Sequence, residues 1–177
     1  MKTNGPDEQG SERLEPDELG MLLDRHGAAL ELFARQWTES AADVVQDAFV
    51  KLAGQSKPPE QVVGWLYRVV RNGAIAVARS ESRRKRHEST GAELRPNWFT
   101  ASPEDRIDGD AASRALSALP QAQREVIVAR LWGGLSFQEI ADLLELSSST
   151  AHRYYEAGLT TLREELGEIC HREKNRE

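Results

Sequence analysis

Apolar side chains in this sequence recur at the three- and four-residue spacing of amphipathic helices, and no stretch shows the sustained alternation expected of a strand. After Pro16, for example, Leu19, Leu22, Leu30 and Phe33 fall on one helical face. Prolines and glycines interrupt the pattern at a few places and mark helix ends there. We therefore expect an all-α fold.

The helical segments fall into two blocks, which we expect to form two small helical domains joined by a flexible linker. Residues 88–112 contain Gly91, Pro96, Pro103 and Gly109 and show no periodicity, which is typical of a linker. The expected organisation is a disordered acidic tail over 1–16, a first domain over 17–88, a linker over 89–112, a second domain over 113–168 and a polar tail over 169–177.

Composition excludes several classes of protein. No run approaches the 18 apolar residues of a membrane-spanning helix, and the first residues lack the apolar stretch of a secretory signal. The single cysteine, Cys170, rules out a disulfide framework and a cysteine-based zinc site. No nucleophile with a base, carboxylate pair or phosphate-binding glycine loop stands out. We expect a cytoplasmic protein that is not an enzyme and binds neither metal nor cofactor.

Positive charge is concentrated in one short segment of an acidic chain. The formal net charge is −6, yet residues 68–86 contain seven basic side chains and one acidic side chain, Glu81. Such a stretch is a candidate site for a polyanion, although a solvated helix face would have the same composition.

The helix expected after Ser40 has two different faces. Ser40 and Asp43 have the spacing of a capping box at its start. The inward stripe comprises Val45, Ala48, Phe49 and Leu52, and the opposite face comprises Asp43, Gln46, Asp47 and Val50. An exposed valine among acidic groups is typical of a docking face, with an ordinary solvated face as the alternative.

The next helix, from about residue 60 to about 86, places a basic stripe opposite an apolar one. The expected buried stripe is Val62, Leu66, Val69, Gly73 and Val77. The opposite side comprises Arg68, Arg71, Asn72, Arg79, Arg83 and Arg86, with Trp65 beside it. Repeated guanidinium groups suit phosphates, and a flanking aromatic ring suits stacking on an unpaired base. The alternative is that Trp65 is a core residue.

The second block has a helix-turn-helix pattern. Ser136 and Glu139 form a capping box, a turn follows at 145–147, and Ser147 can cap the second helix. The inward stripe of that helix is Ala151, Tyr155, Leu159, Leu162 and Leu166. The residues available to a major groove are Ser148, Ser149, Thr150, His152, Arg153 and Tyr154. A helical hairpin without DNA contacts is the alternative.

Four motifs, in this order, resemble those of bacterial RNA polymerase sigma factors of the extracytoplasmic-function (ECF) type. Residues 43–52 resemble D-x-x-Q-[ED]-x-F-x-[KR]-L, and 65–72 resemble W-L-x-x-I-A-x-N. Residues 119–126 resemble L-P-x-x-x-R-E-V, and 134–141 resemble G-L-S-Y-x-E-I-A.

The resemblance implies a role for each surface. The face formed by Asp43, Gln46, Asp47 and Val50 would bind core RNA polymerase. The basic stripe would hold the melted minus-ten element, and the helix-turn-helix would bind the minus-thirty-five element as duplex. The polymerase would perform the chemistry, and an anti-sigma factor is a further candidate partner.

The chain departs from the family pattern at three places. Ala76 stands where the family has Asp, and the recognition helix keeps one arginine near its start, Arg153. Glu145 stands where the turn has Gly, which would strain a left-handed position by ~1–2 kcal/mol.

Two other functions remain open at the level of sequence. One is a stand-alone helix-turn-helix regulator, which would not need the acidic face around Asp47. The other is an adaptor that binds polymerase without reading a promoter.

Overall fold

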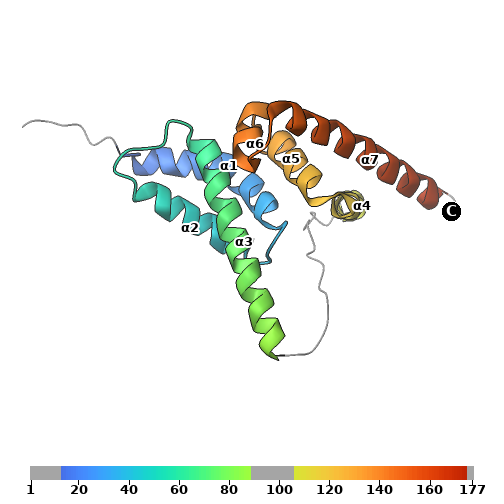
Figure 1. Ribbon diagram of the computed structural model, residues 1–177, viewed down its shortest axis with the longest axis horizontal. Coiled ribbons are helices and arrows are strands. Elements are labelled where there is room, and N and C mark those ends of the chain that lie inside the picture. The colour runs from blue at the N-terminus through green and yellow to red at the C-terminus, as the bar shows by residue number, and fades with distance from the viewer. Residues whose placement is uncertain (1–12, 89–105, 175–177) are drawn as a thin grey trace, which may run out of the picture.

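The computed structural model describes residues 13–88 and 106–174, and every regular element in these ranges is an α-helix. Figure 1 shows two groups of helices side by side, α1 to α3 and α4 to α7. The helices are α1 (Pro16–Ala34), α2 (Ala41–Ala53), α3 (Val62–Glu88), α4 (Arg106–Ala118), α5 (Gln121–Leu131), α6 (Phe137–Leu144) and α7 (Ser148–Lys174). The prediction of an all-α fold with a helix-turn-helix is therefore confirmed.

Three helix ends differ from the expected segment boundaries. Helix α1 already begins at Pro16, which was expected to close a disordered tail. Helix α4 begins at Arg106 and takes in the last part of the expected linker, 89–112. Helix α7 runs to Lys174, through most of the expected polar tail, 169–177. The rest of the tail and linker predictions fall on residues 1–12, 89–105 and 175–177. These residues lie outside the described part of the chain.

The start of α2 is capped differently from the expectation. The Ser40 side chain makes no capping hydrogen bond, because its backbone (φ −80°, ψ 36°) lies outside the extended conformation of an N-cap. Instead, the Ser40 N–H donates to Oγ1 of Thr38 over 3.1 Å. The Thr38 hydroxyl donates in turn to Glu81 over 3.2 Å, which ties the α1–α2 turn to α3. The capping box predicted for Ser40 and Asp43 was wrong.

The buried side of α3 is rotated from the predicted stripe. Its fully buried residues are Leu66, Tyr67, Val70 and Ala74, whereas Val62, Val69, Gly73 and Val77 are half-buried. Helical periodicity predicted a single narrow buried stripe. In the structure α3 also packs against α6, so its buried surface is wider and includes Tyr67.

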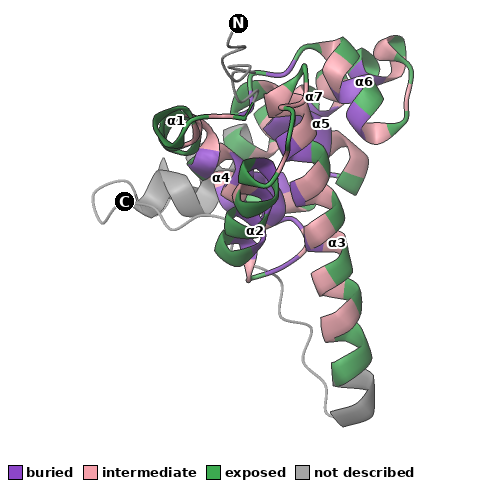
Figure 2. Cartoon of the chain, turned by 90° about the vertical axis from the view of Figure 1, so that its left-hand side faces the viewer, coloured by how far each residue is buried: buried purple, intermediate pink, exposed green. Residues whose placement is uncertain are grey.

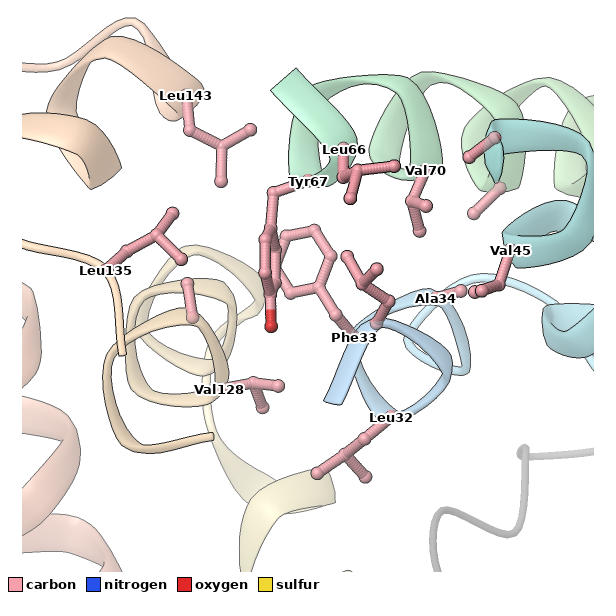
Figure 3. Close-up of a cluster of buried hydrophobic side chains, with 14 of the residues drawn as sticks. Leu32, Phe33, Ala34, Val45, Leu66, Tyr67, Val70, Val128, Leu135 and Leu143 are labelled. Carbon is pink, nitrogen blue, oxygen red and sulfur yellow. The ribbon is translucent and has the colours of Figure 1, made fainter. Parts of the chain in front are cut away.

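The two groups of helices share one hydrophobic core. Tyr67 of α3 is completely buried, and its ring meets that of Phe33 of α1 edge-on, with centroids 5.0 Å apart. Figure 3 shows Val128 of α5 and Leu135, from the second group, around the same cluster. The far half of α3 leaves this core: Figure 2 shows it extending from the body, and no residue from 75 to 84 is buried.

The turn between α6 and α7 contains a non-glycine residue in the left-handed conformation, as expected. Glu145 has φ 56° and ψ 45° and is the one positive-φ non-glycine residue in the described ranges. We expect Glu145→Gly to raise the free energy of unfolding by about 0.5–1 kcal/mol, because the ~1–2 kcal/mol of relieved strain exceeds the extra chain entropy of glycine. Thermal unfolding measures this gain.

Gly134 provides the control for that measurement. It also has a positive φ, 68°, and open space around its Cα, so Gly134→Ala introduces strain without a steric clash. This substitution should lower stability by about 1 kcal/mol. Equal effects of the two substitutions would contradict the strain argument.

Candidate functional site

One face of α2 carries only exposed residues. Asp43, Gln46, Asp47 and Val50 are all exposed, Val50 to 65%, and they lie opposite the buried stripe of the same helix. The buried stripe comprises Ala41, Val44, Val45, Ala48 and Leu52, while Phe49, which was expected in it, is half-buried. This polar α2 face has two carboxylates and, at its C-terminal end, an exposed valine, which suits binding to a cationic surface with an adjoining apolar patch.

The basic side of α3 is exposed along most of its described length. Arg68, Asn72, Arg79 and Arg83 are exposed, whereas Trp65 is half-buried against the core. Residues 65–83 span roughly 27 Å at 1.5 Å per residue, a length that suits several nucleotides. The side chain of Arg86 lies outside the described part of the chain.

A cavity of about 500 Å³ adjoins the far half of this basic side. It is lined by Trp37, Ile75, Ala78, Arg79, Ser82 and Arg83. In the sequence, Trp37 follows Phe33 at helical spacing. Its ring does pack edge-on against Phe33, with centroids 5.3 Å apart, but another part of its surface lines this cavity.

The second group of helices holds two of the arginines on α3. Nε of Arg71 donates to Oε2 of Glu125 over 2.7 Å, and the Glu125 side chain is 5% exposed. Nη2 of Arg68 lies 3.5 Å from the carbonyl oxygen of Asp142. Sequence reasoning gave no role to Glu125. Glu125 directly precedes the apolar run 126–129 of α5 and is the Glu of the segment that resembles L-P-x-x-x-R-E-V, which was the available signal.

The helix-turn-helix is fixed by caps on both of its helices. At α6, the Glu139 N–H donates to Ser136 Oγ over 3.2 Å, and the Ser136 N–H donates to Glu139 over 2.7 Å, as predicted. Hydrogen bonds from Ser136, through its side chain and then its backbone, hold the pKa of the Glu139 carboxyl below its usual range. At α7, the Thr150 N–H donates to Ser147 Oγ over 3.1 Å, which confirms Ser147 as the cap.

The start of α7 presents some of its predicted contact residues and turns others inward. Ser149, His152 and Arg153 are exposed, whereas Ser148, Thr150 and Tyr154 are half-buried. The Thr150 hydroxyl shares a 2.8 Å hydrogen bond with Ser147. Tyr154 packs against the core, and the Arg153 guanidinium lies 5.9 Å from the centre of its ring.

His152 has neighbours that explain its place without a metal. Its ring meets Phe137 edge-on, with centroids 4.8 Å apart, and its Nδ1 lies 3.5 Å from Glu156. In the described part of the chain, no group of three or more His, Cys, Asp or Glu side chains could hold a metal ion.

No described helix is long and apolar enough to span a membrane.

Comparison with known proteins assigns the second group of helices. The family model described as "Sigma-70, region 4" matches residues 110–162, from α4 into α7. RNA polymerase sigma factor CarQ of Myxococcus xanthus is 28% identical over 159 residues, which cover 84% of this chain and 88% of CarQ.

Two solved structures share the fold over 86% of this chain. One is the sigma factor RpoE from Bartonella quintana, crystallised with the anti-sigma factor NepR, with a TM-score of 0.68, 22% identity and 98% of that chain covered. The other is CnrH in complex with the cytosolic domain of CnrY, with a TM-score of 0.58, 25% identity and 90% of that chain covered.

These similarities agree with the four sequence motifs in kind and in order along the chain. The motifs lie on α2, on α3, across the start of α5, and on α6 with the turn before it. The second group of helices thus matches sigma-70 region 4, and the chain is similar over most of its length to an RNA polymerase sigma factor, in agreement with the resemblance of its motifs to the extracytoplasmic-function type.

Proposed function

We propose a division of labour among three helices of this sigma factor, which binds core RNA polymerase and promoter DNA and directs transcription initiation. The observation that carries the proposal is the separation of three chemically different exposed faces, an acidic one on α2, a basic one on α3 and a small polar one at the start of α7. Sigma factors are regulatory proteins, and we assign no catalytic residue because the polymerase performs phosphoryl transfer.

The polar α2 face binds core polymerase. Asp43 and Asp47 supply charge for steering and register, and Val50 supplies apolar area at one end of the face. An isolated exposed valine is common on protein surfaces, but this one lies one turn from Gln46 and Asp47 on the face that the family motif assigns to the polymerase.

The basic side of α3 binds the minus-ten element as a melted strand. Its members are Trp65, Arg68, Arg71, Asn72, Arg79 and Arg83. Arginines along one face neutralise successive phosphates, and this electrostatic contribution is independent of sequence. Asn72 is exposed and offers both a donor and an acceptor for a base edge.

The start of α7 binds the minus-thirty-five element as duplex. Its members are Ser148, Ser149, Thr150, His152, Arg153 and Tyr154. Exposure favours Ser149, His152 and Arg153 for base contacts, because Thr150 is half-buried and Tyr154 packs against the core.

Compartment and further partners follow from this function. We place the protein in the cytoplasm, where polymerase and promoter lie. The relative from Bartonella quintana was solved with an anti-sigma factor, so we include an anti-sigma factor among the candidate partners. We propose no resident metal or cofactor.

Run-off transcription with purified core polymerase tests the function as a whole. Reactions on a pool of genomic promoters are compared with and without this protein. Discrete transcripts that depend on the protein are expected, and a promoter pool that gives none would contradict the function.

The two DNA surfaces should affect different steps of initiation. We expect Arg153→Ala to weaken initiation that depends on the minus-thirty-five element by ~1–3 kcal/mol, the usual cost of losing a base contact. Neutralising Arg68 and Arg71 together should instead slow opening of the minus-ten region, because these groups contact the separated strand. Permanganate footprinting of unpaired thymines measures opening, and filter binding on duplex promoters measures closed-complex affinity.

Arg163→Ala is a suitable control, since Arg163 is an exposed arginine on the same helix, more than two turns beyond Arg153. It should leave both measurements close to the wild type. Equal effects of Arg153→Ala and Arg163→Ala on the minus-thirty-five element would contradict the assignment of Arg153.

A further inference from the structure

We propose that the cavity beside Trp37 holds one unstacked base of the melted promoter strand, with the indole ring as its stacking platform and Arg79 and Arg83 on the adjoining phosphates. The inference deepens the proposed function and rests on it, because the cavity adjoins the surface of α3 assigned to the minus-ten element. Trp37 lies outside the four sequence motifs and outside the predicted site residues.

The cavity lies between the end of α1 and the far half of α3. Its volume of about 500 Å³ falls within the range of pockets that bind small organic groups, ~300–1,000 Å³. Its half-buried lining is apolar and comprises Trp37, Ile75 and Ala78, whereas its exposed lining is polar and comprises Arg79, Ser82 and Arg83. An apolar inner wall with a hydroxyl and two cations at the opening suits a flat base with a phosphate on either side.

The Trp37 ring is fixed in position before any strand binds. The Trp37 N–H donates to the carbonyl oxygen of Ala34 over 3.0 Å, and the ring packs edge-on against Phe33. The next residue, Thr38, is 2% exposed, and its hydroxyl donates to Glu81 on the helix that forms the opposite wall. A ring that is already held loses little conformational entropy when a base stacks on it.

Charge around the cavity favours a ligand that carries phosphates. Arg79 and Arg83 are four residues apart and therefore neighbours on one face of α3. In the described part of the chain neither forms an ion pair, whereas Arg71 is paired with a carboxylate. Glu81, the one acidic residue within 68–86, does not line the cavity, because its carboxylate faces the turn after α1. The positive charge at the opening is thus unopposed.

The cavity gives the basic side of α3 a second aromatic platform. Residues 65 and 79 are separated by roughly 20 Å along the helix at 1.5 Å per residue. Trp65 is half-buried against the core at one end, and Trp37 lies beside the far half of α3, which extends from the body (Figure 2). A strand that stacks on both rings would be held away from its complement over the length between them.

A comparison of two single strands tests whether Trp37 stacks on a base. The first is a fluorescein-labelled oligothymidine long enough to span the basic side of α3. The second is an abasic strand of the same length, which has the same phosphates and no bases. Thymidine suffices, because stacking on an aromatic ring tolerates any base. Fluorescence anisotropy with the full chain at low salt measures both affinities.

Trp37→Leu should weaken binding of the oligothymidine roughly tenfold and leave binding of the abasic strand unchanged. Trp37→Phe keeps an aromatic ring and should retain most of the affinity. Arg79→Ala combined with Arg83→Ala should weaken binding of both strands and reduce the slope of log affinity against log salt by about 1.4. Trp132→Leu is the matched control, because Trp132 is 42% exposed in the second group of helices and should affect neither strand.

Ala78→Leu tests the cavity by a second substitution, because it fills the space from α3 and leaves Trp37 in place. It should reproduce the base-dependent loss, also if thermal unfolding shows that Trp37→Leu fails to fold. Equal losses on both strands, or equal binding of the two strands by the wild type, would overturn the base site. Normal run-off activity together with such a result would reject the site and leave the proposed function intact, whereas absence of run-off activity would contradict the function itself.

Discussion

Reversing the charge at Asp47 with Asp47→Arg is expected to abolish binding to core RNA polymerase while the protein remains folded. Asp47 is exposed on α2, opposite the buried stripe that includes Val44 and Val45, so the substitution should change the free energy of unfolding by less than about 0.5 kcal/mol. Placing a cation against the cationic surface expected of the partner should cost about 2–5 kcal/mol of binding energy, which is roughly a 30-fold to several-thousand-fold loss of affinity. Co-purification with tagged core polymerase measures the loss.

The experiment has a matched control in Asp24→Arg. Asp24 is an exposed aspartate on α1, away from the polar α2 face, and its reversal changes the net charge by the same amount. Asp43→Arg combined with Gln46→Ala should reproduce the loss seen with Asp47→Arg. Retention of polymerase by both α2 variants would remove the polar α2 face from the polymerase interface.

Features that depend on a few neighbouring residues could be predicted from the sequence. The capping box of Ser136 and Glu139 and the left-handed Glu145 both formed as expected, because each is decided within one helical turn or one tight connection. The exposed face of α2 was also predictable, since a helix covered on one side only follows the 3.6-residue period.

Features that depend on the second group of helices could not be predicted in this way. On α3 the periodicity indicated one buried stripe, but contact with both groups adds Tyr67 to the buried surface. The partner of Arg71, Glu125, lies 54 residues further along the chain, and no local pattern links them. Ser40 has the sequence of an N-cap but not its backbone conformation. Its N–H donates to Oγ1 of Thr38, a contact that the capping pattern does not include.

These successes and failures bear on the assigned surfaces. The α2 face was predicted as a surface and is exposed, whereas at the start of α7 only Ser149, His152 and Arg153 of the predicted residues are exposed. The arginines of the α3 face were predicted to be exposed, yet Arg71 is half-buried in an ion pair, and Trp65, for which a core position was the alternative, is half-buried against the core. The members of the proposed minus-ten surface that are exposed are therefore Arg68, Asn72, Arg79 and Arg83.

The free protein is expected to bind duplex promoter DNA poorly, and binding should become tight only in the presence of core polymerase. Residues 113–177 contain eight basic and ten acidic side chains, a formal net charge of −2. Affinity for duplex DNA depends mainly on phosphate neutralisation, so few cations give weak binding with a shallow salt dependence.

Core polymerase should increase the affinity of the protein for promoter DNA in two ways. It holds two weak DNA modules on one particle, which raises avidity by about 10²–10⁴ when both sites can be engaged together. It also binds the polar α2 face in the proposed function, and this contact adds binding energy that the free protein lacks. A stand-alone regulator would need neither effect.

A gel-shift titration on a cognate promoter, with and without core polymerase, distinguishes the sigma factor from the stand-alone regulator. At physiological salt we expect micromolar or weaker binding by the protein alone and at least a hundredfold gain with polymerase. Asp47→Arg should remove the gain and leave the weak binding of the free protein unchanged, because Asp47 contacts no DNA in this assignment. Nanomolar, sequence-specific binding by the protein alone would favour the regulator and contradict the requirement for polymerase.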